Sequence, residues 1–288
     1  MDRARRSPGG TPPRVSVTLI ARDEEDRLPD TLASVAFADE VVVVVDAASS
    51  DRTEEIARAF GARVLVRMFD GFGTQKNAAA DLTTSPWILS VDADEVVSPE
   101  LALEIRARLH ELTRTPASPD APVAFRVPIC LEFLGRTLHF GRDTVVRPVR
   151  LYHRDRARFS PDAIHEKVLA SGPVDSLDET MLHRSYRDLS HYLVKLDRYT
   201  TLAAEAKRAA GKERMPFLPL RVAWDFFDRA VLRLGFLDGT AGLTFAALSA
   251  GNTLLKYLKL RELETNAARD QAEEETARPA ETLSLGAR

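Results

Sequence analysis

The sequence has a single cysteine, Cys130, among its 288 residues. One thiol cannot form an intrachain disulfide, and such sparing use of cysteine is typical of a reducing compartment. A surplus of positive charge is also missing, because 40 basic residues face 43 acidic ones and leave a formal charge of -3. Nucleic-acid-binding proteins usually carry a basic field. We therefore expect a cytoplasmic protein that has no nucleic-acid partner.

A signal peptide and a glycine-rich phosphate loop are missing as well. Residues 1–13 contain three arginines but continue with proline and glycine instead of an apolar stretch, which predicts a disordered arm. No glycine-rich turn follows the apolar segment that ends at Ile20, and the Walker pattern is not found. The glycine-rich turn lets the backbone approach the pyrophosphate of a dinucleotide, and the Walker pattern forms the phosphate-binding loop of ATPases. Both kinds of site are therefore excluded.

The sequence does contain a regular alternation of apolar and helix-forming segments over residues 14–112. The apolar segments are residues 15–20, 41–45, 63–66 and 87–91. Their lengths, and the pure valine run in the second, are typical of strands that are covered on both faces. Segments of helical spacing lie between them, and Ser98 followed by Pro99 predicts a helix start after the last one. This order predicts an α/β fold with a doubly wound sheet.

The rest of the chain divides by composition. A stretch rich in proline, serine and threonine opens residues 113–187, which form a second and more irregular region. Residues 188–263 return to helical spacing and include the most apolar part of the chain. Residues 264–288 are acidic and rich in alanine, which predicts a disordered tail.

Acidic residues stand directly after the predicted strands. Glu24 follows the first strand, Asp46 follows the second, and an Asp-x-Asp (DxD) motif of Asp92 and Asp94 follows the fourth. In an open parallel sheet the ligand lies outside the carboxyl ends of the strands. Two carboxylates at such a position can converge on a divalent ion that also binds substrate phosphates. Short acidic triplets are common on solvated loops too, but the position after a buried strand favours a metal site.

Several motifs together resemble one family. They are TLIARDEE at residues 18–25, ADEVVVVVD at 38–46, SDRT at 50–53, DGFGTQKN at 70–77 and SVDADE at 90–95. Further matches are RLYHR at 150–154, HE at 165–166, LH at 182–183, YTT at 199–201 and RLGFLDG at 233–239. The chain resembles the family 2 glycosyltransferases, in particular the subgroup similar to lipopolysaccharide-core β-1,4-glucosyltransferases. The resemblance spans residues 15–260.

The resemblance implies a GT-A type fold, a nucleotide-diphosphate sugar donor, and a Mg²⁺ or Mn²⁺ ion on Asp92 and Asp94. Residues 14–112 would then bind the donor, and residues 113–187 would bind the acceptor and complete the catalytic site. The donor-binding residues that it implies are Arg22, Glu24, Asp46, Lys76 and Asp92. From the residue type alone, Lys76 could instead lie on a solvated helix face, where most lysines are found.

The chain departs from the family pattern at two places. Asp23 stands where the family usually has asparagine, and residues 47–50 replace a turn of the Ser-Gly-Ser-Thr type. The first change adds negative charge beside the expected diphosphate, and the second stiffens a turn that often contains glycine. Neither change touches the carboxylates expected to bind the metal.

His165 and Glu166 are the candidate catalytic pair. They resemble half of a zinc-protease motif, but Leu169 stands where the second histidine would be needed, so a hydrolytic zinc site is rejected. Glu166 is instead our candidate general base for an inverting displacement, with His165 orienting it or joining the metal shell. A structural pair at a domain seam is the alternative. Asp143 and Asp162 are reserve bases. Four arginines could line the acceptor or diphosphate side or form a solvated basic face, namely Arg142, Arg147, Arg150 and Arg154.

These features predict an inverting, metal-dependent glycosyltransferase that moves a hexose such as glucose onto an acceptor hydroxyl in cell-envelope or lipopolysaccharide-core synthesis. A nucleotidyltransferase is the nearest rival, but it normally carries a glycine-rich and basic loop after its first strand. A noncatalytic membrane-surface scaffold built on a transferase fold is the rival of another class. The joint presence of Asp92, Asp94 and Glu166 favours the enzyme.

The C-terminal region predicts attachment to a membrane surface. One helical stripe holds Leu220, Ala223, Trp224, Phe227, Ala230, Val231 and Leu234, and the opposite face holds Arg221, Asp225, Asp228, Arg229 and Arg233. The charge-free residues 239–255 fall short of the roughly 20 strongly apolar residues that a spanning helix needs. Lys256, Tyr257 and Lys259 then form a basic and aromatic edge. We expect a peripheral protein at the inner face of the plasma membrane, with a lipid-linked or lipopolysaccharide-type acceptor. Packing of these helices on the enzyme domain or on a second subunit is the alternative.

Overall fold

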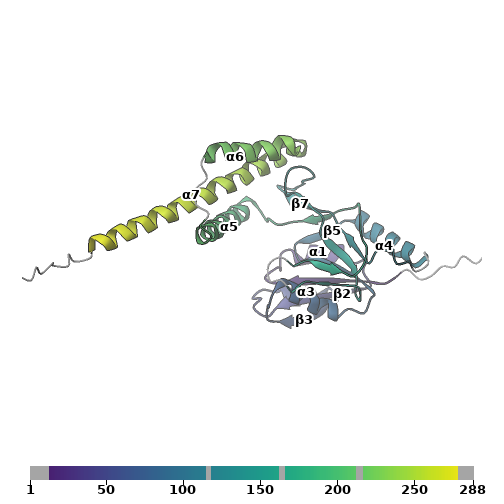
Figure 1. The fold of residues 1–288 in the computed structure, drawn as a ribbon. Coiled ribbons are helices and arrows are strands. Elements are labelled where there is room, and N and C mark those ends of the chain that lie inside the picture. The colour runs from purple at the N-terminus through teal and green to yellow at the C-terminus, as the bar shows by residue number, and fades with distance from the viewer. Residues whose placement is uncertain (1–12, 115–117, 162–165, 212–216, 278–288) are drawn as a thin grey trace, which may run out of the picture. The chain divides into compact units, whose positions relative to one another are not determined.

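The computed structural model describes residues 13–114, 118–161, 166–211 and 217–277 (Figure 1). The chain forms two compact units, which are described separately below. Unit 1 holds the described residues up to His139 and those of Asp143–Ser185. Unit 2 holds Phe140–Arg142 and the described residues from Tyr186 onward. The arm expected at residues 1–13 lies, up to residue 12, outside the described residues.

Unit 1 begins with the predicted alternation of strands and helices. Its elements are β1 (Val15–Ala21), α1 (Leu28–Ser34), β2 (Glu40–Asp46), α2 (Thr53–Ala59), β3 (Arg63–Arg67), α3 (Phe72–Asp81), β4 (Trp87–Asp92), β5 (Glu95–Val97) and α4 (Pro99–Arg114). Strand β1 pairs in parallel with β2 and β4, and β2 pairs in parallel with β3. Three strands that carry predicted site residues therefore end at the same edge of one sheet.

The valine run of β2 shows why the sheet is covered on both faces. Val43 and Val45 point into the main core, which includes Leu28 of α1 and Leu101 of α4. Val42 and Val44 point to the other face, where they pack with Ala79 of α3. Successive side chains of a strand alternate between faces, so an uninterrupted apolar strand needs helices on each side. The predicted α/β class with a doubly wound sheet, as expected of a GT-A fold, is confirmed.

The later strands of unit 1 are β6 (Ala124–Arg126), β7 (Ile129–Phe133), β8 (Arg136–Thr137), β9 (Val145–Val146), β10 (Val149–His153), β11 (Ala157–Phe159), β12 (Val168–Ala170), β13 (Val174–Ser176) and β14 (Met181–His183). Of these, β6, β10 and β13 extend the same sheet and the others form smaller sheets. The seven-stranded sheet has the order β13-β6-β10-β4-β1-β2-β3, and β10 runs antiparallel to β4. A smaller sheet has the order β5-β14-β7-β8. The two halves expected at residues 14–112 and 113–187 thus share one sheet and one unit.

Unit 2 is helical. It contains α5 (Leu189–Ala209), α6 (Leu218–Phe227), a π-helical turn (Asp228–Leu232), a 3-10 turn (Gly235–Asp238) and α7 (Gly239–Ala277). Helix α7 contacts both α5 and α6. The amine of Lys259 lies 2.6 Å from the Asp197 carboxylate, and Thr253 Oγ1 donates a hydrogen bond to Asp225. Lys259 is thus paired within the bundle, and the contact of Lys256, Tyr257 and Lys259 with head groups stays a prediction.

Helix α7 also corrects the predicted disordered tail. The expectation of disorder from residue 264 is wrong up to Ala277, where the helix ends. This segment is rich in alanine and glutamate, which are strong helix formers. Arg269 and Glu273 form an ion pair one helical turn apart, which gives further local support. Residues 278–288 lie outside the described residues.

Candidate active site

A cavity of about 540 Å³ lies at the carboxyl ends of β1, β2 and β4 in unit 1. All but one of the residues predicted for the site line it, namely Arg22, Glu24, Asp46, Lys76, Asp92, Asp94 and Glu166. The exception, His165, lies outside the described residues, as does the reserve base Asp162. Residues from three strand ends, one helix and a distant loop therefore meet at a single site.

Asp92 lies between two cations. Its Oδ2 is 2.6 Å from Arg150 Nη2, and its Oδ1 is 3.0 Å from Lys76 Nζ. Burial opposes ionisation, but the charges of Arg150 and Lys76 outweigh it and hold the pKa of Asp92 well below its usual range. About 33% of the side chain is still exposed, so a ligand in the cavity can reach this carboxylate.

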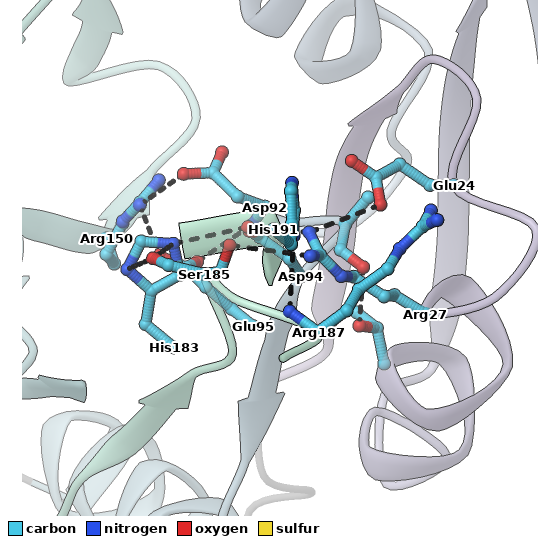
Figure 2. A network of polar contacts seen from close by, with 12 residues as sticks. Glu24, Arg27, Asp92, Asp94, Glu95, Arg150, His183, Ser185, Arg187 and His191 are labelled. Carbon is cyan, nitrogen blue, oxygen red and sulfur yellow. Dashed lines mark hydrogen bonds and ion pairs between the residues drawn. The ribbon is translucent and has the colours of Figure 1, made fainter. Parts of the chain in front are cut away.

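Asp94 has a different set of neighbours (Figure 2). Its Oδ2 lies 3.3 Å from His183 Nε2 and 3.5 Å from Arg27 Nη1. Arg27 also lies 3.7 Å from Glu24, so it ties this carboxylate to the loop after β1. Burial works against the charged form, but the hydrogen bond from His183 lowers the pKa of Asp94, and the same contact raises the pKa of His183. Asp94 is thus held ionised at neutral pH.

The third acidic residue of the motif, Glu95, turns into the protein. It is 2% exposed, accepts a hydrogen bond from the Asp92 backbone N–H, and lies 2.7 Å from Arg150. Burial raises the pKa of Glu95 to about 7. Arg150 joins Asp92 and Glu95 through the same nitrogen, Nη2. Glu95 and Arg150 therefore anchor the turn that presents Asp92 and Asp94.

Lys76 connects the metal motif to the candidate base. Its Nζ lies 2.9 Å from Glu166 and 3.0 Å from Asp92, and the residue is only 5% exposed. The alternative of a solvated helix face is wrong, because the side chain is buried between two carboxylates. A buried lysine of this kind is stable as a cation only where opposite charges pair with it.

A close approach of α3 fixes the segment that carries Glu166. A Cβ atom at Gly73 would lie 1.9 Å from the Ser160 carbonyl oxygen and 3.4 Å from the Glu166 Cβ, so only glycine fits here. One turn further along α3, the Asn77 side chain donates to the Phe159 carbonyl and accepts from the Phe159 N–H. These contacts hold Glu166 against Lys76.

Asp23, which stands where the family usually has asparagine, holds two loops of the site together. Asp23 adopts the left-handed conformation with φ 53°, which aspartate and asparagine tolerate better than most residues. Its Oδ1 accepts a hydrogen bond from the Ser50 N–H at 2.8 Å, and this bond lowers the pKa of Asp23. Through this hydrogen bond, the Asp23 side chain links the loop after β1 to the turn after β2. Next to them, Asp46 is 5% exposed and lies 3.4 Å from Arg22.

Several residues of the site were not identified from the sequence. Arg27 and His183 both contact Asp94, but no sequence pattern assigns either of them a role. Phe69 and Phe72 also line the cavity, with ring centroids 5.0 Å apart and more than 40% of each residue exposed. Exposed aromatic rings at a cavity can stack on a planar base. Gln75 lines the same cavity, and its buried Oε1 has no hydrogen-bond partner within the described ranges, so it can accept one from a ligand.

The site suits a metal that is shared with a phosphate ligand. No group of three or more histidine, cysteine, aspartate and glutamate side chains among residues 13–114, 118–161, 166–211 and 217–277 is arranged to hold an ion. Asp94 and His183 offer one oxygen and one nitrogen donor, while both oxygens of Asp92 already contact cations. Mg²⁺ is typically bound by one or two carboxylates plus substrate phosphates. The residues present therefore fit an ion whose remaining ligands come from a diphosphate.

Residues 16–117 match the domain described as glycosyl transferase family 2. The segment includes the whole DxD motif and the ends of β1, β2 and β4, where the cavity lies. It is a family 2 glycosyltransferase domain. The remainder of unit 1 adds Arg150, Glu166 and His183 to the site of this domain.

Two proteins that match most of the chain are similar to it at low identity. An uncharacterized glycosyltransferase of Rickettsia typhi is 27% identical over 260 residues, covering 87% of each chain. The lipopolysaccharide core biosynthesis glycosyltransferase LpsC of Rhizobium meliloti is 26% identical over 269 residues, covering 86% of this chain and 94% of LpsC. Among solved structures, the mannosyltransferase PcManGT of Pyrobaculum calidifontis, in complex with GDP-Man and Mn²⁺, is 15% identical with a TM-score of 0.42, covering 89% of this chain and 80% of its own.

Proposed function

We propose that this family 2 glycosyltransferase moves a hexosyl group from a nucleotide-diphosphate sugar to an acceptor hydroxyl, with inversion at the anomeric carbon. The observation that carries the proposal is the single cavity lined by Asp46, Lys76, Asp92, Asp94 and Glu166. These side chains come from positions up to 120 residues apart, and neither their burial nor their pairing serves the core. Such convergence of charged groups at the edge of a parallel sheet favours a ligand site.

The donor would lie at the strand ends. Arg22, Glu24 and Asp46 stand where a nucleoside can be hydrogen-bonded, with the Phe69 and Phe72 rings beside it. Asp94 and His183 would hold Mg²⁺ or Mn²⁺, with Asp92 next to them. When bound, such an ion neutralises the charge of a departing diphosphate. Lys76 adds a fixed positive charge on the same side of the cavity, which favours the leaving group further.

Glu166 is the candidate general base. Its Oε1 accepts a hydrogen bond from Lys76, which fixes the carboxylate at the wall of the cavity. As the acceptor oxygen forms its bond to the anomeric carbon, the bond from that carbon to the diphosphate oxygen breaks, and the acceptor proton passes to Glu166. The diphosphate takes the electron pair of the broken bond. A positioned base of this kind contributes roughly 10²- to 10⁴-fold in rate.

The acceptor class is proposed from the relatives. The name of the LpsC relative, a lipopolysaccharide core glycosyltransferase, supports a role in cell-envelope glycan synthesis. Acceptors of that kind are carried on lipids, so attachment of the enzyme to the cytoplasmic face of the inner membrane would bring it to its substrate. The C-terminal helices are our candidate for that attachment.

The outer surface of α6 supports a membrane contact. Leu220 is 70% exposed and Trp224 is 53% exposed, while Asp225 is 7% exposed and pairs with Arg221. A helix that faces water shows the reverse pattern. In the described part of the chain no single helix is apolar and long enough to cross a bilayer, and only the pair Leu218–Leu232 and Gly235–Asp270, bent by 70°, meets that test together. An amphipathic element that lies in the interface suits these data.

One experiment tests the enzymatic proposal directly. The purified full chain is incubated with a panel of nucleotide sugars, with Mg²⁺, Mn²⁺ or EDTA, and released nucleoside diphosphate is measured with and without saccharide acceptors. We expect one donor to be turned over only with metal present. If no nucleotide sugar is bound or turned over under any of these conditions, the proposed function is wrong.

A further inference from the structure

A second cavity of about 500 Å³ lies against the first in unit 1. Lys76, Asp92 and Glu166 line both cavities, so these three side chains form a common wall. The rest of the second cavity is lined partly by apolar residues of β10, β11 and β12, including Val149, Phe159 and Val168. Its other lining residues include three cations, Arg126, Arg150 and Lys167.

The three cations differ in how their charge is used. Arg150 is buried and neutralised by Asp92 and Glu95. Arg126, at the end of β6, and Lys167, next to Glu166, are exposed, and neither side chain pairs with a carboxylate of any described residue. Other arginines of unit 1 do find such partners, as Arg106 does with Asp39 and Arg158 with Asp81. The second cavity therefore carries two positive charges that no carboxylate of the described residues matches.

We propose that the second cavity is the acceptor subsite and that it takes an anionic saccharide, one with a carboxylate or phosphate near its reactive hydroxyl. This inference rests on the proposed transferase function. The acid group of the saccharide would lie at Arg126 and Lys167, and its hydroxyl would point to Glu166.

The common wall supports this assignment. In a displacement with inversion, the acceptor approaches the anomeric carbon from the side opposite the diphosphate, so donor and acceptor need adjoining cavities with the base between them. Glu166 stands at that position. The apolar side chains of Phe159 and Val168 can cover the C–H face of a sugar ring. A guanidinium matches the two oxygens of a carboxylate or phosphate, and charge-assisted hydrogen bonds of this kind are stronger than neutral ones.

The test compares matched acceptors on the full chain. Three saccharides of the same size are used, one neutral, one with a carboxylate and one with a phosphate, at fixed donor and metal concentrations. We expect the wild-type protein to transfer preferentially to an acidic acceptor, and the arms of the panel show which acid group it takes. In Arg126→Ala and Lys167→Ala, the KM for that acceptor should rise on the order of tenfold each, with a smaller change in kcat.

Controls separate this inference from the proposed function. Arg58→Ala removes an exposed arginine of α2 that lines neither cavity and should behave as wild type. Arg126→Lys keeps the charge and should retain part of the selectivity. If the wild type turns over no donor, the proposed function fails and the inference fails with it. If transfer occurs but neutral and acidic acceptors are used equally, or if the alanine variants keep full selectivity, only the inference is overturned.

Discussion

Asp92 and Asp94 are two residues apart, yet their surroundings give them different tasks. Asp92 has both oxygens on cations, Arg150 and Lys76. Asp94 uses one oxygen for His183 and Arg27. An ion that binds Asp94 therefore replaces only its longer contacts with His183 and Arg27. An ion on Asp92 would have to displace the closer ion pairs with Arg150 and Lys76. We expect Asp94 to be the main protein ligand and Asp92 to support it.

Asp94→Asn tests this assignment. The variant keeps the size and shape of the side chain but loses the charge that attracts a divalent ion, so we expect turnover to fall by two or more orders of magnitude with the fold intact. Activity is measured across a metal titration, and the fold is checked by circular dichroism. Near-normal turnover at saturating metal would contradict the assignment.

Glu166→Gln separates the base from the donor site. A base acts on the acceptor in the transition state, so we expect kcat to fall about 10²- to 10⁴-fold while donor affinity changes little. Nucleotide-sugar affinity is measured by calorimetry beside the steady-state rates. A collapse of donor binding would place Glu166 in the donor site, and Asp143 would become the candidate base among the described residues.

At the scale of elements, helix α3 determines where Lys76 and Glu166 meet. At Gly73 the helix packs against the Ser160 carbonyl so closely that no side chain would fit. The Asn77 side chain of the same helix donates a hydrogen bond to the Phe159 carbonyl. The position of the base thus depends on a helix that lies about 90 residues earlier in the chain.

Gly73→Ala is expected to lower both stability and activity. The new Cβ would overlap the Ser160 carbonyl oxygen, a backbone atom that cannot rotate away, so the loop must move. Overpacking of this kind costs about 1–3 kcal/mol. The free energy of unfolding and kcat are measured together. The matched control is Gly251→Ala in α7, where, apart from the local backbone of the helix, no atom of the described residues lies within 4 Å of the added Cβ. An effect as large there would contradict the packing argument.

The outer face of α6 can be tested without removing a helix. In Leu220→Ser/Trp224→Ser, two exposed apolar side chains become polar, so we expect reduced flotation with anionic liposomes but an unchanged thermal unfolding midpoint. Leu103→Ser is the control, because Leu103 is 72% exposed on α4 in unit 1. Equal flotation of wild type and both variants would argue against α6 as the contact surface.

The elements also show what the sequence could predict. Strands β1, β2 and β4 and the acidic residues at their ends follow from local patterns, because apolar runs identify buried strands and parallel strands end at one edge. The position of His183 does not follow, since it depends on the pairing of β14 with β5, which sets His183 opposite Glu95. Arg150 likewise reaches Asp92 only because β10 pairs with β4. Long-range pairing of this kind has no periodic signature.

For the molecule as a whole, two carboxylates at the start of β2 tie this strand to the start of β1 and to the residues before β4. Asp39 accepts a hydrogen bond from the Val15 N–H, and Glu40 accepts from Ser16 and Thr84. Burial opposes ionisation of both groups, but these hydrogen bonds outweigh it and lower the pKa of each. A lowered pKa adds stability that is fully present above the unfolded value and is lost as the pH falls through the folded value.

We therefore expect acid sensitivity that begins below about pH 4.5, the ordinary pKa of glutamate. Glu40→Gln should be less stable than wild type at pH 7, and the difference should shrink as the pH falls toward 3. Urea unfolding at several pH values measures this change. Glu55→Gln, at an exposed position of α2, is the control and should follow the wild-type curve. A constant difference between Glu40→Gln and wild type at all pH values would contradict the linkage.

The Arg150 contact has a consequence for how such sequences can diverge. One guanidinium nitrogen serves both Asp92 and Glu95, and the arginine is buried beneath the DxD turn. Losing Arg150 would leave the buried Glu95 without its ion-pair partner, which typically costs several kcal/mol, and losing either carboxylate would leave Arg150 with one partner instead of two. Among homologues, these three positions should therefore be retained or replaced together, although Arg150 lies more than 50 residues from its partners in the chain.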